Sequence, residues 1–272
     1  MKKYFFLLAA CALFATGCDN SQNQPNQNEP SKFSINTITV ADSVQFPPEA
    51  LEEGLAENMA SYSAVVDAPI TENETLRNNI TNWIGSLLNE DYNGDSQDVK
   101  AMVELEKKAF FEEIEEEMDL TPAYVEHTIK MEEDNDRFVS YRGENWLYMG
   151  GAHGTTYVEG ATFSKATGKR FSFNMFKNPA QMREMIHAAL QQQYYEPLME
   201  GSDMTFEDAV FLEIAEAFPL PETNPWIRND SVLFIYQDSE ISSHAFGLPG
   251  CGIPYENLKD QLTEEGMTFF NK

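Results

Sequence analysis

The stretch "AYVEHTIKMEEDNDRFVSYRGENWLYMGG", residues 123–151, decides the fold class. Apolar and polar residues alternate on both sides of a Glu-Asp-Asn-Asp turn at residues 133–136, which is the period-two pattern of β-strands. The next segments, "TTYVEGATFS" at residues 155–164 and "KRFSFNMF" at residues 169–176, predict a hairpin around an Ala-Thr-Gly turn. Successive strands joined by short turns predict an antiparallel meander.

Upstream of the meander, residues 33–46 and 60–70 alternate as two further strands. Two amphipathic helices follow, at residues 72–90 and at about residues 97–118, because apolar residues recur there at spacings of three and four. The apolar face of the first consists of Leu76, Ile80, Trp83, Ile84, Leu87 and Leu88. That of the second consists of Val99, Met102, Val103, Leu105, Ala109, Phe110, Ile114 and Met118, with "EEIEEEM" on the solvent side.

Downstream, the chain predicts a helix at about residues 178–199, an acidic helical stretch at 205–218, a strand or strand pair at 226–242 and a short helix opened by Pro254. Strands and helices thus occur in blocks without regular alternation. This pattern predicts an α+β fold with two sub-domains, in which a mostly antiparallel sheet packs against helices.

The N-terminal residues predict export and lipid anchoring. Lys2-Lys3 precede a short apolar run, and Ala15-Thr16-Gly17-Cys18 resembles a bacterial lipobox, in which Cys18 becomes the lipidated N-terminus. The polar, Pro-containing residues 19–33 then form a flexible tether. An ordinary cleaved signal is the alternative. We therefore expect a bacterial envelope protein, held at the periplasmic face or the cell surface, with the following divisions: 1–18 signal, 19–33 tether, 34–119 N-terminal α+β domain and 120–272 C-terminal α+β domain.

Composition limits the chemistry. Of three cysteines, only Cys251 remains in the folded part, where we expect a small buried residue in a tight loop and no disulfide. The net charge of −27 disfavours nucleic acid and favours basic partners through faster encounter, although acidity alone also keeps an exported protein soluble.

No metal or cofactor site is predicted. Asp91, Asn93 and Asp95 have the spacing of a calcium loop, but the glycine comes too early and Met102 stands where the bidentate Glu should be. We expect a helix-to-helix turn there, with Asp98 or Ser96 capping the second helix. The four histidines are scattered and form no ligand pair.

The segment Gly150-Gly151-Ala152-His153-Gly154 raises a sharper question. Its glycines permit unusual dihedrals or a close backbone approach, with or without a ligand. We expect a loop at a strand end, with His153 hydrogen-bonded inside it. The alternative is an enzyme in which His153 acts as a base beside Asp238 or Glu240.

Residues 148–176 resemble the signature segment shared by the C-terminal extracytoplasmic domain of RsiV-type anti-sigma factors and by PdaC-type peptidoglycan deacetylases. A Gly-Gly-Ala-His element precedes an aromatic residue, here Tyr157, then a strand and a Thr-Gly-Lys turn. The later "VLFIYQDSEISSHAFGLPGCGIPYENL" resembles the closing pattern of that family, and residues 34–119 are similar in layout to its small partner domain.

The resemblance implies an extracytoplasmic binding module that is frequently non-enzymatic and that binds lysozyme, a basic protein, in RsiV. The sequence shows neither a sigma-binding segment nor the Asp-His-His metal set of the deacetylases. We therefore expect a lipid-anchored, non-enzymatic binding protein for a basic protein such as lysozyme or for a cell-wall glycan. Gly150, Gly151, His153, Gly154 and Tyr157 are the candidate loop or binding residues. A glycan-modifying enzyme and a structural envelope lipoprotein are the alternatives.

Overall fold

A computed structural model of the chain describes residues 32–46, 59–89, 91–116, 122–211 and 218–270. The predicted signal, Cys18 and nearly all of the tether lie outside these residues. Within them, no helix combines the length and the apolar character needed to span a bilayer.

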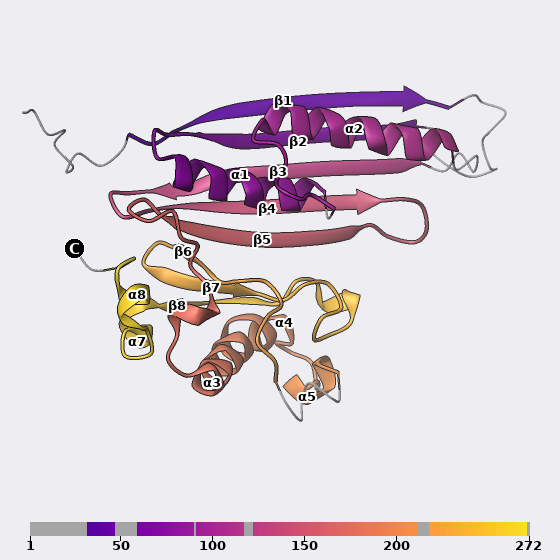
Figure 1. Cartoon of the computed structure of the whole chain (residues 1–272). Coiled ribbons are helices and arrows are strands. Elements are labelled where there is room, and N and C mark those ends of the chain that lie inside the picture. The colour runs from indigo at the N-terminus through magenta and orange to yellow at the C-terminus, as the bar shows by residue number, and fades with distance from the viewer. Residues whose placement is uncertain (1–31, 47–58, 90, 117–121, 212–217, 271–272) are drawn as a thin grey trace, which may run out of the picture.

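The strands form two sheets (Figure 1). The first has the order β1–β2–β3–β4–β5 and the second β6–β7–β8. The first sheet consists of β1 (Ser34–Gln45), β2 (Met59–Ile70), β3 (Ala123–Asp134), β4 (Phe138–Tyr148) and β5 (Thr155–Ser164). The second consists of β6 (Trp226–Arg228), β7 (Ser231–Ile235) and β8 (Gly250–Pro254). Every pairing is antiparallel except β2 with β3, so the predicted α+β class is confirmed.

Helices α1 (Glu74–Leu88) and α2 (Val99–Glu116) form the crossover that the parallel β2–β3 pair requires, and both lie on one face of the first sheet (Figure 1). The Oδ1 of Asn73 caps α1 by accepting the N–H of Leu76 at 3.1 Å. Asp98 caps α2 through the N–H of Ala101 at 3.1 Å, as predicted. All six predicted apolar residues of α1 are buried.

A buried carboxylate joins the first three strands. Asp67 on β2 accepts hydrogen bonds from the hydroxyl of Thr37 at 2.7 Å, from the Nζ of Lys130 at 3.1 Å and from the N–H of Met131 at 3.1 Å. It is 4% exposed, so its charge is stabilised by these three donors and hardly by water.

The C-terminal half has its own hydrophobic core, with the β6–β8 sheet packed on helices (Figure 1). Its helices are α3 (Pro179–Leu190), α4 (Glu196–Leu198), α5 (Phe206–Ala209), α7 (Tyr255–Leu258) and α8 (Glu264–Met267). The predicted helix at about residues 178–199 is interrupted by a π-helical turn, Gln191–Tyr195. Asn229 and Asp230 turn the β6–β7 hairpin with φ values of 50° and 56°, as tight hairpins require.

The two halves meet at β5. Trp226 lies over Gly160, where a Cβ would come within 2.0 Å of its ring. The amide of Gln237 pairs with both backbone groups of Val158, donating to its oxygen at 2.7 Å and accepting its N–H at 3.0 Å. These contacts cover the edge strand of the first sheet and fix the second sheet against it.

Several sequence predictions need correction. Residues 169–176 make two isolated β-bridges, Phe163 with Arg170 and Phe176 with Leu262, and no continuous strand, because Phe171 turns into the C-terminal core and a 3₁₀ turn, Phe173–Met175, follows. Leu105, expected on the apolar face of α2, is 63% exposed. Cys251 is buried on strand β8 and not in a loop.

The domain division expected between residues 119 and 120 falls between α2 and β3, which belong to one layered unit. The first hydrophobic cluster runs from Ile38 to Phe163, and the second contains most of the later apolar residues. The described core therefore divides near the end of β5.

Replacing Asp67 tests whether its carboxylate holds the first three strands together. Asp67→Ala leaves buried donors unpaired, so we expect a loss of about 2–4 kcal/mol in the free energy of unfolding, measured by denaturant titration. Asp91→Ala, at an exposed turn, is the control and should change it by less than about 0.5 kcal/mol. Equal effects of the two changes would contradict the assignment.

Burial raises the pKa of the Cys251 thiol to about 12. The native protein therefore holds almost no thiolate until the pH approaches that value, whereas an unfolded cysteine ionises near pH 8.5. In the chain from Asp19 onward, we expect Ellman's reagent at neutral to mildly alkaline pH to react slowly with the native protein and rapidly after unfolding. Rapid reaction of the native protein would refute the burial of this thiol.

Candidate functional site

The face of the first sheet opposite α1 and α2 carries the most distinctive surface. Side chains alternate along a strand, and Asn145 faces the helices, where its Nδ2 donates to the backbone oxygen of Leu87 at 2.7 Å. Its neighbours Trp146 and Tyr148 therefore project from the other face. Tyr124 is the register partner of Tyr148 and projects with it.

Three rings form what we call the aromatic platform: Tyr124, Trp146 and Tyr148. Their centroids are 5.8 Å apart for the tyrosines, 6.1 Å for Tyr124 and Trp146, and 6.4 Å for Trp146 and Tyr148, with planes within 27° of parallel. In a single column, the outer rings would be about 7 Å apart or more. The three rings instead form a compact cluster of nearly parallel, offset rings, and each is half-buried.

The loop between β4 and β5 is fixed against this platform. The hydroxyl of Tyr148 donates to the backbone oxygen of Gly151 at 3.0 Å. A Cβ on Gly154 would lie 2.7 Å from the Nε1 of Trp146 and 2.8 Å from the oxygen of Leu147. Gly150 and Gly151 have φ values of 89° and 92°. These glycines therefore serve the positive dihedrals and close approach that the sequence suggested.

Charged side chains border the platform. Glu126, the register partner of Trp146, is exposed. Glu144 forms an ion pair with Arg142 at 2.7 Å on the same face. The apolar rings thus lie beside groups that can donate or accept hydrogen bonds.

His153 meets a second histidine that the sequence analysis did not single out. Its ring stacks on that of His244 with centroids 3.9 Å apart and planes 13° from parallel. The Nδ1 of His244 in turn lies 2.6 Å from the Oδ2 of Asp238. Among the described residues, the hydrogen bond of His153 within its loop is the long contact with the backbone oxygen of Gly154 at 3.3 Å, so the loop itself holds the ring weakly.

The carboxylate–imidazole pair leaves the Nε2 of His244 as a potential base. The side chain of His244 is 45% exposed, however, so water has ready access to it. Glu240 is used differently: it accepts the N–H groups of Gln237 and Glu222 at 2.7 and 2.9 Å. Burial raises its pKa, and these two hydrogen bonds oppose that shift.

Tyr157 lies on the helix-covered face, since it is the register partner of Asn145. Its hydroxyl donates to the Oε2 of Glu159 at 2.8 Å, and burial, followed by the charge of Glu159, raises its pKa. The structure therefore places Tyr157 on the face of the sheet opposite to the platform.

A buried polar chain supports the platform from below. The Nδ1 of His127 lies 2.9 Å from the Oδ1 of Asn145, and its Nε2 lies 3.3 Å from the Oε1 of Glu106 on α2. Because Asn145 precedes Trp146, its contacts with His127 and with Leu87 on α1 hold the strand that carries the platform.

No group of three His, Cys, Asp or Glu side chains among the described residues is placed to hold a metal ion. In the loop that resembled a calcium site, the Oδ1 of Asn93 accepts the N–H of Asp95 at 3.1 Å. This contact is the turn that the sequence favoured over a calcium loop.

Residues 56–156 match the protein family described as "Deacetylase PdaC", which confirms the resemblance to PdaC-type proteins. No curated protein matched the chain. Two solved structures have a similar fold. A DUF3298 family member from Bacteroides fragilis has a TM-score of 0.59 at 16% identity, over 88% of this chain and 97% of that one. A DUF3298 family protein from Pseudomonas aeruginosa has a TM-score of 0.53 at 14% identity, over 86% and 96%.

Proposed function

We propose that this protein is a lipid-anchored, non-enzymatic binding protein of the bacterial cell envelope, and that its aromatic platform binds a cell-wall glycan. The platform is the observation that carries the proposal. Three half-buried, nearly parallel rings cluster on one sheet face, and their exposed aromatic area gains free energy only when something covers it.

A glycan has the chemistry to cover it. The C–H faces of a pyranose are flat and apolar and pack on aromatic rings, while its rim of hydroxyls requires hydrogen-bonding groups. Glu126, Arg142 and Glu144 provide such groups beside the platform. The resemblance to PdaC-type peptidoglycan deacetylases favours the same ligand class.

The N-terminal sequence supports the location. Lys2-Lys3, the apolar run and the lipobox-like Ala15–Cys18 fit a lipoprotein signal. A flexible tether of residues 19–33 would extend on average about 20 Å from the membrane. That reach suits a protein that binds a polymer close to its anchor.

A basic protein, such as lysozyme, is the second candidate partner, and the charge of −27 favours it. Many of the few cations are already paired with carboxylates inside the protein, including Lys130 with Asp67 and Arg170 with Glu159. The acidic surface is therefore left uncompensated.

Binding fits the geometry better than catalysis does. The Asp238–His244 pair could act as a general base, but its histidine is close to half exposed and so lacks the water-excluded setting in which such a base is most effective.

The platform can be tested with a matched control. We expect Trp146→Ala and Tyr148→Ala to weaken binding to purified peptidoglycan sacculi and to chitin oligosaccharides by about tenfold or more, because each loses stacking area. Tyr157→Ala removes an aromatic residue that is 37% exposed on the opposite face, and should bind as the wild type does. Sedimentation assays and calorimetry measure both. Equal binding by all three variants would refute the platform as the site.

The dependence of binding on ionic strength distinguishes the two candidate partners. Binding of c-type lysozyme through the acidic surface should weaken several-fold between low and moderate ionic strength, since exposed charges are screened. Glycan binding through ring stacking should hardly change. Calorimetric titrations at two salt concentrations measure both affinities. An affinity for lysozyme that does not change with salt would contradict the electrostatic account.

A further inference from the structure

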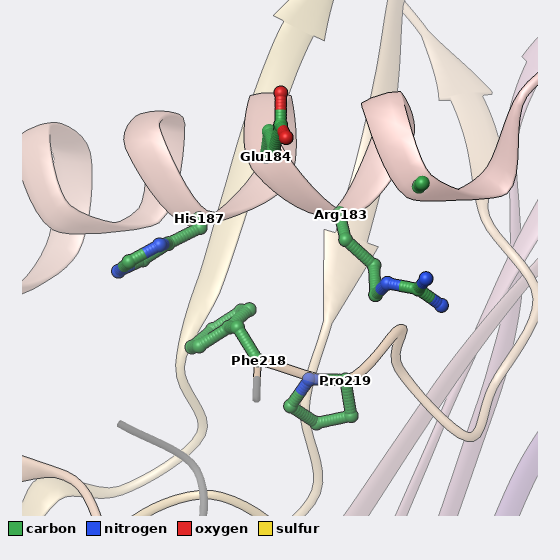
Figure 2. Close-up of a pocket in the computed structure, with 6 residues that line it drawn as sticks. Arg183, Glu184, His187, Phe218 and Pro219 are labelled. Carbon is green, nitrogen blue, oxygen red and sulfur yellow. The ribbon is translucent and has the colours of Figure 1, made fainter. Parts of the chain in front are cut away.

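A cavity lies in the C-terminal half, between helix α3 and the segment at residues 218–219. Its volume is about 430 Å³, within the range of small-molecule sites. The lining residues are Ala180, Arg183, Glu184, His187, Phe218 and Pro219. Figure 2 shows Arg183 and His187 on the side of α3 that faces Phe218 and Pro219, whereas Glu184 points away.

One wall of this cavity is aromatic and uncharged. The ring of His187 stacks on Phe218 with centroids 4.6 Å apart and planes 13° from parallel, and it lies 4.8 Å from Phe206. Burial lowers the pKa of His187, and the charge of Glu207 opposes this only in part, which favours the uncharged form of the imidazole. The backbone oxygen of Pro219 accepts the hydroxyl of Tyr236 at 2.9 Å, which fixes this side of the cavity to the C-terminal core.

The other side of the cavity carries Arg183, which differs from the other arginines in having no partner among the described residues. The chain has six arginines, all within the described residues, and five are partnered. Arg77, Arg142, Arg170 and Arg228 pair with carboxylates, and Arg137 donates to the oxygen of Phe269. Arg183 makes no ion pair or hydrogen bond within the described part of the chain. Arg183 is exposed, so its guanidinium is free to pair with an anion that enters the cavity.

We propose that this cavity binds a monocarboxylate carried on an apolar or aromatic body. The guanidinium of Arg183 pairs with the carboxylate, for which its fork of donors is suited, and the Phe218–His187 wall covers the apolar body. Glu184 at the rim disfavours a second negative charge. The free carboxyl end of a short peptide and a free small acid share this chemistry. The inference does not depend on glycan binding by the platform.

The test uses the chain from Asp19 onward, which contains both hydrophobic clusters, and three probes: N-acetylphenylalanine, its neutral amide, and N-acetyl-Ala-Ala-Phe with a free carboxyl end. Calorimetry or NMR titration in the millimolar range measures their affinities. We expect the acid to bind about tenfold more tightly than the amide, and Arg183→Gln to remove that difference. Phe218→Ala should weaken both probes.

Lys100→Gln, at an exposed position of α2, is the charge-matched control and should leave binding unchanged. Unchanged thermal melting curves confirm that each variant is folded. Tighter binding of the peptide than of the amino acid would identify a chain end as the ligand, and equal binding would identify a small acid; both support the proposal. Equal binding of acid and amide, wild-type binding by Arg183→Gln, or no binding of any probe would overturn it.

Discussion

The register between β3 and β4 determines which side chains meet on each face of the first sheet. A shift of one residue would exchange the two faces, because side chains alternate along a strand. In the observed register, Tyr124 stands opposite Tyr148, and His127 stands opposite Asn145. One face thereby gains the aromatic platform, and the other gains the contacts of Asn145 with His127 and with Leu87 on α1. The interactions that stabilise the fold and those that form the candidate site therefore depend on the same pairing.

Electrostatics organises the rest of the molecule. With 45 acidic and 18 basic residues, the protein uses many of its cations to neutralise specific carboxylates. Lys130 neutralises the buried Asp67, Arg170 neutralises Glu159 beneath Trp83, and Arg228 reaches Glu132 across the boundary between the halves. Arg183 differs from the other arginines in facing a cavity without such a partner. The acidic surface and this cavity are therefore candidate sites for two different ligands.

The periodicity of apolar residues predicted the helices and strands better than it predicted the candidate functional site. The spacing of apolar residues identified α1 and its buried face, and alternation identified β1 to β5. Residues 169–176 were predicted as a strand because their pattern resembles one, but Phe171 gains more by joining the C-terminal core than by extending the sheet. The domain boundary was expected between residues 119 and 120, where helical periodicity gives way to alternation, whereas the parallel β2–β3 pair carries the sheet across it.

The platform and the histidine pair required tertiary information. Trp146 and Tyr148, two residues apart on a strand, are a visible sign of a shared face, but Tyr124 joins them only through the register. His244 reaches His153 from a distant part of the chain, and no local pattern relates them. The role of the glycines around His153 could be predicted from the sequence, because their backbone dihedrals are a local property.

The central claim is that a glycan covers the aromatic platform, and the three tryptophans allow it to be tested in one spectrum. Trp83 and Trp226 are 5% exposed, and their Nε1 atoms donate to Glu159 and Glu132, whereas Trp146 is half-buried at the surface. Titration of a ¹⁵N-labelled sample with cell-wall glycan fragments should shift the indole N–H signal of Trp146 saturably and leave the other two in place. An unmoved Trp146 signal at saturating glycan, or shifts at Trp83 or Trp226 alone, would contradict the account.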